Sequence, residues 1–268
     1  MKDILGEIIV NKRVEVEEQK KAVGLRTLLT MGGEQLERTT SSMKKALADS
    51  TSGIIAEFKR KSPSKGWLYP DAKIENIVPL YEKNGAAACS ILTDSKFFGG
   101  SLNDLQSARK LVDIPLLRKD FILDEYQLYQ ARIMGADAVL LIAAALSEGQ
   151  CLLLAQTAHE LNLEVLLEIH TEEEFAYLNP YIDMLGINNR NLGTFHTDVE
   201  NSFRLASRKL TPLSSNGGVL MISESGVSNT ETVKKLRKVG FQGFLIGETF
   251  MKTEHPGETL HKFIGDLQ

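Results

Sequence analysis

The stretch IIAEFKRKSPSKG, residues 54–66, begins as an apolar strand and ends in a basic, proline-containing loop. The strand places Glu57 and Lys59 two residues apart, so both side chains project from the same face. Seven further apolar runs rich in Val, Ile and Leu follow it. With the first, the runs cover residues 53–59, 86–94, 114–121, 138–144, 164–170, 184–190, 219–225 and 243–249.

The segments between these runs carry helical periodicity, for example SLNDLQSARKLV and NTETVKKLRKVG. Several end at a residue suited to a left-handed helix cap, namely Gly135, Asn162 or Gly240, and the next strand follows within a few residues. Short connections of this kind favour parallel βα units, and eight of them predict an α/β fold, the (β/α)8 TIM barrel. A doubly wound open sheet is the alternative, but the chain has no GxGxxG turn.

About 50 residues precede the first strand. Helical patterns cover residues 3–22 and 42–48. An independent small domain is possible there, yet no linker separates it from the strands that follow. We therefore expect a single barrel domain over residues 1–268, with residues 1–50 as an N-terminal helical extension that packs on the barrel and covers one of its ends.

Composition excludes several classes of protein. The net charge of −4 and the pI near 5.8 give no broad positive field for nucleic acid. The sequence has no run of about 18 apolar residues and no signal-peptide pattern at its start, so we expect a cytoplasmic protein without a membrane segment. Cys89 and Cys151 lie in apolar surroundings and are expected to be reduced packing residues.

Polar residues stand at the ends of the apolar runs, where barrel enzymes build their active sites. They are Glu57 and Lys59, Thr93 and Asp94, Lys119, Glu168 and His170, Asn188 and Arg190, and Glu224 and Ser225. Each alone is compatible with a salt bridge at the rim. Lysines and glutamates in one partly dry cavity shift one another's pKa, so the set predicts general acid–base catalysis.

Other chemistries fit the sequence less well. A Schiff base on Lys119 or Lys59 stays open. A serine nucleophile lacks its GxSxG turn, and the histidines lack the spacing of metal ligands, so no metal site is expected. The last two strands reach Gly226 and Gly247 where they end, and loops at these places in barrels often bind phosphate through backbone N–H groups.

Seven blocks of the sequence resemble the indole-3-glycerol phosphate synthase family of the tryptophan pathway. They are IIAEFKRKSPSKG, ILTDSKFFGGSLNDL, PLLRKDFILDEYQLYQARIMGADAVLLIAA, EVLLEIH, LGINNRNLGTF, ISESGV and FLIGETFM. The blocks occur in the family's order over nearly the whole chain. The resemblance implies a carboxy-lyase without metal or cofactor that converts 1-(2-carboxyphenylamino)-1-deoxyribulose 5-phosphate into indole-3-glycerol phosphate, CO2 and water.

The resemblance also implies roles for four charged residues. Lys119 matches the general acid of ring closure, and Glu168 matches the general base of the dehydration. Glu57 and Lys59 match a second acid–base pair. For Lys59, both protonation of the leaving hydroxyl and binding of the phosphate stay open.

Further residues match substrate-binding positions of the family. Asn188 and Arg190 are expected at the substrate, with the anthranilate carboxylate or Glu57 as the partner of Arg190. The remaining positions are Ser62 in the loop after the first strand, Phe98, Phe121 and Leu140 as apolar walls, Glu224 and Ser225 near the sugar hydroxyls, and Gly226, Gly247 and Glu248 at the phosphate. Some family members have serine in place of Glu248, whose backbone N–H is expected to donate while its carboxylate points away. Leu140 fits ordinary core packing almost as well.

The expected partner is therefore a small phosphorylated substrate, with no nucleic acid and no membrane. The basic run that ends at Lys65 is expected to be a solvated loop, either a mobile lid assisted by Trp67 or a static loop. We expect a monomer, with weak association with other tryptophan-pathway enzymes as a possibility. A barrel that binds phosphate without catalysis is the remaining alternative, but it has no need for four acid–base residues.

Overall fold

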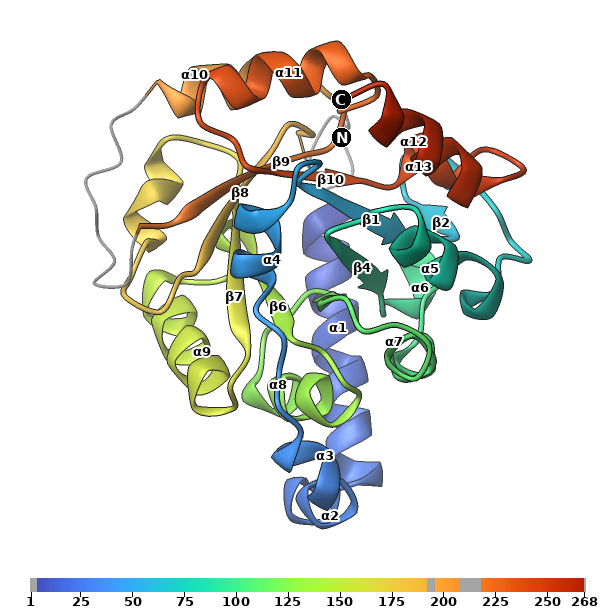
Figure 1. Cartoon of the computed structure of the whole chain (residues 1–268). Helices are drawn as coiled ribbons and strands as arrows, with labels where there is room; N and C mark the ends of the chain where they lie inside the picture. Colours follow the sequence, from blue (N-terminus) through green and yellow to red (C-terminus); the bar gives the residue numbers. More distant parts are fainter. Residues whose placement is uncertain (1–3, 192–195, 208–217, 268) are drawn as a thin grey trace.

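The computed structural model describes residues 4–191, 196–207 and 218–267, and within them eight parallel strands close into a barrel (Figure 1). Each strand pairs with the next along the chain, and the last pairs with the first. The barrel strands are β1 (Ile54–Phe58), β4 (Ala88–Leu92), β5 (Leu116–Lys119), β6 (Ala138–Ile142), β7 (Glu164–Ile169), β8 (Met184–Asn188), β9 (Leu220–Glu224) and β10 (Gly243–Ile246). All lie inside the predicted runs, so the (β/α)8 prediction is confirmed and the open sheet is wrong.

Helices surround the barrel and connect its strands (Figure 1). They are α5 (Ile74–Lys83), α6 (Ser95–Phe98), α7 (Leu102–Arg109), α8 (Glu125–Ile133), α9 (Glu148–Glu160), α10 (Glu200–Ala206), α11 (Thr230–Lys238), α12 (Glu248–Met251) and α13 (Pro256–Gly265), with short 3₁₀ turns η1 (Ala143–Ala145) and η2 (Glu173–Tyr177). The predicted cap residues Gly135, Asn162 and Gly240 all have positive φ. No helix in the described ranges has the length and apolar character needed to cross a membrane.

The apolar core has an inner and an outer part. Side chains that alternate along the strands fill the barrel interior, including Ile55, Leu117, Leu166 and Ile222. The opposite faces of the same strands pack against the surrounding helices. Cys89 and Cys151 belong to this outer part, where both are buried free thiols as predicted.

Residues before β1 form four helices, two of which the sequence did not predict. They are α1 (Ile4–Ala22), α2 (Leu25–Met31), α3 (Gly33–Glu37) and α4 (Met43–Asp49). In Figure 1, α4 lies in front of the barrel and α1 behind it. Met43 and Leu47 of α4 join the interior core at the end where the strands begin. The Lys44 backbone N–H at that end donates to Glu164, the first residue of β7, at 2.9 Å. Ile4, Leu5 and Ile8 of α1 lie at the other end, where the strands finish, so the extension contacts both ends of the barrel rather than one.

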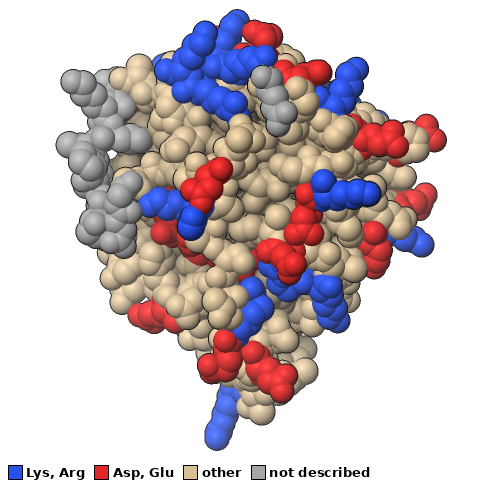
Figure 2. Space-filling model, in the orientation of Figure 1, with Lys and Arg blue, Asp and Glu red and all other residues tan. Residues whose placement is uncertain are grey.

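The loop after β1 forms a short hairpin of β2 (Lys61–Ser62) and β3 (Gly66–Trp67). Its base is fastened by Arg60, whose guanidinium donates to both carboxylate oxygens of Asp104 at 2.7 and 2.9 Å. Arg60 also donates to the carbonyl of Gly99. Because these contacts take Arg60 out of the basic run, the loop presents less positive charge than its sequence indicates. Figure 2 shows basic and acidic side chains interspersed over most of one face, with a basic group over α11.

Candidate active site

A cavity of about 360 Å³ opens at the carboxyl-terminal ends of the barrel strands. Of the polar residues predicted at the strand ends, Thr93, Asp94 and His170 do not line it. The structure brings every residue with a predicted catalytic, substrate-binding or phosphate-binding role to its lining. These are Glu57, Lys59, Ser62, Phe98, Lys119, Phe121, Leu140, Glu168, Asn188, Arg190, Glu224, Ser225, Gly226, Gly247 and Glu248. One block of the family resemblance, LGINNRNLGTF at residues 185–195, is described only in part, because its last four residues lie outside the described ranges. The position of the predicted residues is thus known, and their chemical roles stay predictions.

Four of these side chains form one layer across the barrel. Glu57, Lys119, Glu168 and Glu224 come from alternate strands, β1, β5, β7 and β9. In barrels of this size, alternate strands supply the members of each interior layer. The pairing of Leu92 with Lys119, Ile142 with Glu168 and Asn188 with Glu224 is consistent with this arrangement. The alternation seen in the sequence therefore ends in a charged layer that faces the cavity.

Lys119 is the centre of this layer. Its ammonium lies 3.1 Å from Glu168 Oε2 and also donates to Glu224 Oε2. Burial alone would lower the pKa of Lys119, but the negative charges of Glu224 and Glu168 outweigh it and hold this pKa above its ordinary value. Lys119 is consequently a positively charged donor at neutral pH. Lys59 forms an ion pair with Glu57 beside it.

The two carboxylates that share Lys119 differ in proton affinity. Burial would raise the pKa of Glu168, but Lys119 and His170 outweigh burial and lower it to about 2. Burial raises the pKa of Glu224 to about 7, because the attraction of Lys119 is opposed by the charge of Glu168. One member of the pair is therefore ionised at neutral pH, and the other titrates there. Within the described chain, Glu224 Oε1 is buried without a hydrogen-bond partner.

Two glycines make room for the carboxylates. A Cβ on Gly186 would lie 2.1 Å from Glu224 Oε1, and one on Gly247 would lie 2.3 Å from Glu57 Oε1. Any larger residue would displace the carboxylate. The sequence predicted Gly247 only as a phosphate-binding residue, and it did not predict Gly186 at all. Nothing local marks Gly186, because its reason lies on the neighbouring strand β9.

An apolar wall closes one side of the cavity. The rings of Phe98 and Phe121 lie 6.1 Å apart between centroids, and Leu140 lines the same cavity. The helix α1 adds Ile4, Leu5 and Ile8, which the sequence did not predict for the site. Its amphipathic pattern shows an apolar face but not what that face covers. A planar aromatic group is the natural occupant of such a wall.

The opposite side of the cavity is made by the turns after β9 and β10. Ser225 and Gly226 both have positive φ, at 65° and 75°. Gly247 precedes the four-residue α12, which begins at Glu248. The Glu248 carboxylate lies 3.6 Å from Arg190 Nη2, and its direction relative to a phosphate stays a prediction. Lys252, which the sequence did not predict, also lines this side.

Arg190 connects several loops around the mouth. Its guanidinium donates to Ser64 Oγ of the hairpin loop and lies near Glu248. The Asn188 side-chain oxygen accepts from the Arg190 backbone N–H at 2.9 Å. Among the described residues, the carboxylate that pairs with Arg190 is therefore Glu248 and not Glu57. The hairpin loop is fastened at Arg60 and is held by Arg190 at its tip.

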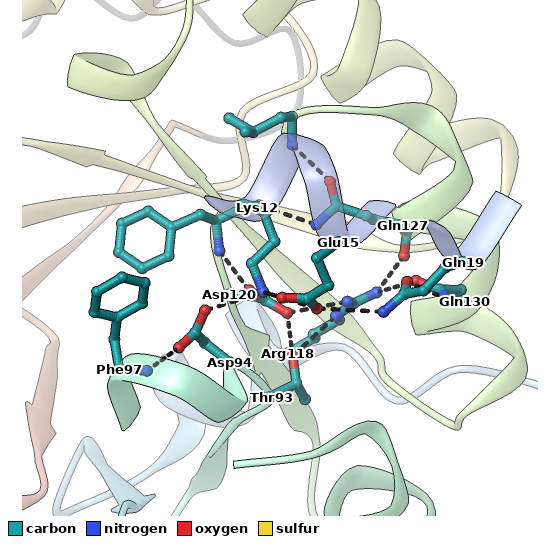
Figure 3. Close-up of polar contacts among 12 residues, drawn as sticks. Lys12, Glu15, Gln19, Thr93, Asp94, Phe97, Arg118, Asp120, Gln127 and Gln130 are labelled. Atoms are coloured by element: carbon teal, nitrogen blue, oxygen red, sulfur yellow. Dashed lines mark hydrogen bonds and ion pairs between the residues drawn. The ribbon is translucent and has the colours of Figure 1, made fainter. Parts of the chain in front are cut away.

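A second group of buried charges connects α1 to the ends of β4 and β5 (Figure 3). Lys12 of α1 is fully buried, with its ammonium 3.0 Å from Asp94 and 2.9 Å from Asp120. Arg118 lies 3.0 Å from Asp120. Each aspartate also fixes the backbone beside a wall residue, since Asp94 accepts from Phe97 N and Asp120 from Phe121 N. Of this group the sequence indicated only Asp94, as a polar residue at a strand end. It did not predict Lys12, because a lysine in an amphipathic helix normally faces solvent.

Comparison with known proteins agrees with this geometry. Residues 5–263 match the family model described as "Indole-3-glycerol phosphate synthase". The chain is 62% identical to the indole-3-glycerol phosphate synthase of Bacteroides thetaiotaomicron over 268 residues, the full length of both. It is 41% identical to that of Neisseria gonorrhoeae over 98% of this chain and 99% of the other.

Solved structures with low sequence identity show the same fold. The tryptophan synthase α subunit of Legionella pneumophila aligns with a TM-score of 0.60 at 14% identity, covering 84% of this chain and 96% of the other. A thiamine phosphate pyrophosphorylase from Pyrococcus furiosus aligns with a TM-score of 0.57 at 13% identity, covering 84% of this chain and 99% of the other. At these identities the likeness concerns the fold alone.

Proposed function

We propose, from the premise that the chain belongs to the indole-3-glycerol phosphate synthase family, that the charged layer at its barrel mouth performs the acid–base steps of the family reaction. This reaction closes the pyrrole ring of 1-(2-carboxyphenylamino)-1-deoxyribulose 5-phosphate in tryptophan biosynthesis, with loss of CO2 and water. The aromatic carbon that bears the carboxylate attacks the ribulose ketone. The developing alkoxide needs a proton, and the later loss of water needs both an acid and a base.

Lys119 is the proposed acid of ring closure. Its ammonium is held by Glu168 and Glu224 in the buried layer, and its side chain is only 13% exposed. In that position it stabilises negative charge on the ketone oxygen and then donates a proton to it. This single observation carries the proposal, because a buried ammonium at the centre of a cavity gives the attack both its charge stabilisation and its proton.

Glu168 is the proposed base of the dehydration. Its low pKa keeps it ionised, and it lies beside the acid at 3.1 Å. The ion pair of Glu57 with Lys59 is the proposed second acid–base pair, with Lys59 protonating the leaving hydroxide or holding the phosphate. Glu224 and Ser225 are proposed near the sugar hydroxyls, where a titrating carboxylate accepts or donates a hydrogen bond.

The two sides of the cavity suit the two ends of the substrate. We infer that the anthranilate ring lies against Phe98, Phe121 and Leu140. The phosphate is proposed at the turns of Gly226, Gly247 and Glu248, which bring backbone N–H groups to the cavity. Ser62, Asn188 and Arg190 stand between these sides at the loops of the mouth. The roughly 360 Å³ of the cavity fits a ligand of this size.

The organisation and setting of the chain are also part of the proposal. We infer one barrel domain with residues 1–50 as its extension, because α1 and α4 both contribute to the interior core or the cavity. We expect it to work as a monomer in the cytoplasm, with at most weak association with other enzymes of the pathway. Sedimentation analysis with and without the candidate partner enzymes tests this.

Turnover of the carboxyphenylamino substrate tests the proposed function directly. Purified protein is expected to produce rising indole fluorescence at the same rate with and without EDTA. The variant Glu168→Gln is expected to slow a step after ring closure, so rapid-mixing spectroscopy should detect an accumulating intermediate. Substrate binding without consumption by the unmodified protein would contradict the proposal.

A further inference from the structure

A second cavity lies beside the first and shares Leu5, Asn188 and Arg190 with it. Its own lining includes His170, Thr171 and other residues after β7 and β8. The charged layer of the first cavity does not reach it, because Glu168 lines only the first cavity. His170, directly after β7, lines the second cavity and lies beside Glu168 of the first.

His170 stands between two carboxylates. Its Nε2 lies 3.4 Å from Glu168 Oε1, and its Nδ1 lies 3.7 Å from Glu174 Oε2. The side chain is only 11% exposed, and both ring nitrogens are buried without a hydrogen bond to any described residue. Glu168 thus has two sides. Its Oε2 faces Lys119 and its Oε1 faces His170.

Because Glu168 is buried, a proton that it takes up can leave only through a neighbouring side chain. Glu168 is only 3% exposed even without ligand. A substrate in the first cavity would cover the remaining surface on that side. A base that has taken a proton must lose it before the next turnover. With substrate in the first cavity, the neighbours that can receive it are Lys119 beside Oε2, once that lysine has given up its own proton, and His170 beside Oε1.

We propose that His170 is a positioning and proton-transfer residue for Glu168, which holds this carboxylate from behind and carries its proton to Glu174 and the second cavity. The inference rests on the proposed role of Glu168 as the base. Before reaction, the imidazolium of His170 faces both ionised carboxylates. When Glu168 takes the substrate proton, Nδ1 releases a proton to Glu174 or to water. The ring then turns and its free nitrogen takes the proton from Glu168. This restores the starting state of His170 and Glu168 with one proton delivered to water, and the lysines that act as acids regain their protons from water.

The charges around His170 support this order of proton transfers. Burial lowers the pKa of His170, but Glu174 and Glu168 outweigh burial and raise it. Glu224 on β9 acts in the same direction, while Arg190 and Arg204 line the second cavity. Because the charge of Glu168 disappears on protonation, the imidazolium then holds its own proton less tightly. Release at Nδ1 is thereby coupled to uptake at Glu168.

Chemical rescue tests the proposal. His170→Ala is expected to lower kcat by about tenfold to a hundredfold, since positioned proton transfer contributes at least this much. Added imidazole should enter through the second cavity and restore kcat at least severalfold, with the rescue following the pKa of a series of substituted imidazoles. The matched control is His261→Ala, on the exposed face of α13, with unchanged kcat and no response to imidazole.

Three outcomes would overturn the proposal. The first is unchanged kcat in His170→Ala. The second is a lost kcat that no imidazole restores although the melting temperature is kept. The third applies if His170→Ala does not fold: His170→Asn, which keeps a donor but cannot carry a proton, then shows normal kcat. Glu168→Gln in the same assay separates the two proposals. Full turnover there would sink the role of Glu168 itself, whereas an inactive Glu168→Gln beside a fully active His170→Ala would refute only the role of His170.

Discussion

Two groups of buried charge lie side by side at the same end of the barrel, and they differ in balance. The mouth cluster consists of Glu57, Lys59, Lys119, Glu168 and Glu224. The clamp cluster consists of Lys12, Asp94, Arg118 and Asp120. The two meet at consecutive residues of β5 and its loop. Two flanking groups stand at the edges, His170 beside Glu168 and the partly exposed Glu15 at 3.0 Å from Lys12. Without these two, the mouth cluster has three acids for two bases, whereas the clamp cluster has two of each.

We expect this difference to distinguish the cluster that performs chemistry from the one that maintains structure. In the clamp cluster, Lys12 and Arg118 lower the pKa of Asp120 against the effect of burial, so its charges are fixed. In the mouth cluster, Glu168 and Glu224 share the ammonium of Lys119, and burial together with the negative charge of Glu168 raises the pKa of Glu224. A balanced buried group maintains one geometry, while an unbalanced one holds a proton that can move near neutral pH.

Removal of the central ammonium should break the mouth cluster most severely. Lys119→Met keeps the length of the side chain but removes the donor, and we expect kcat to fall about 10⁴-fold, through loss of both acid catalysis and charge stabilisation. Substrate affinity should stay within about tenfold, as for an interaction made mainly in the transition state. Steady-state kinetics and substrate titration measure both. A kcat near that of the unmodified protein would remove Lys119 from the mechanism.

Removal of the clamp ammonium should act on stability instead. Lys12→Met leaves Asp94 and Asp120 buried with only Arg118 to balance them, so we expect the free energy of unfolding to fall by about 3–5 kcal/mol. Urea denaturation measures it. The matched control is Lys21→Met on the exposed face of α1, with a change within about 0.5 kcal/mol.

A second substitution tests whether charge balance is what stabilises the clamp cluster. The double variant Lys12→Met with Asp94→Asn removes one charge of each sign, and it should recover part of the lost stability. If the double variant is less stable than Lys12→Met alone, side-chain packing rather than charge balance stabilises the clamp cluster.

Lys119→Met should lower the free energy of unfolding less than Lys12→Met does, because Glu224 can take up a proton when the ammonium is gone.

Substitution of Gly186, which lies beside Glu224, should perturb the mouth cluster less than loss of Lys119. The Cβ introduced by Gly186→Ala would lie 2.1 Å from Glu224 Oε1, so the carboxylate must move away from Lys119. We expect kcat to fall about 100-fold, since displacements of about 1 Å in a site cost this much. Gly149→Ala is the control, because a Cβ there meets nothing within 4 Å. Equal kcat in both variants would show that the position of Glu224 does not matter.

The two clusters also differ in how far the sequence predicts them. Glu57, Glu168 and Glu224 interrupt apolar runs, so their anomaly is visible in the strand itself. Lys12 stands in a helix with many charges, and its partner Asp120 is more than 100 residues away, so only tertiary packing makes it buried. The fold was predictable because strand and helix periods are local. The clamp cluster, Gly186 and the contribution of α1 to the apolar wall depend on residues distant in the chain, which no local sequence pattern predicts.

The smallest expected effect is a difference in pH dependence. The pKa of Glu224 is raised from 4.5 in the unfolded chain to about 7 in the fold, so the folded state binds the extra proton. Stability from this group is complete below about pH 4.5 and is lost as the pH rises toward 7. Asp120, whose pKa is lowered, has the opposite sign: its contribution is lost as the pH falls below about 4.

Glu224→Gln should therefore remove one of these slopes. Its free energy of unfolding, measured relative to the unmodified protein by urea denaturation, should increase by about 1–3 kcal/mol between pH 5 and pH 8 and then level off. Gln keeps the shape of the protonated carboxyl group, so the comparison isolates the proton. Parallel stability curves for the two proteins across this range would mean that Glu224 is ionised throughout, and the mouth cluster would then be no less balanced than the clamp cluster.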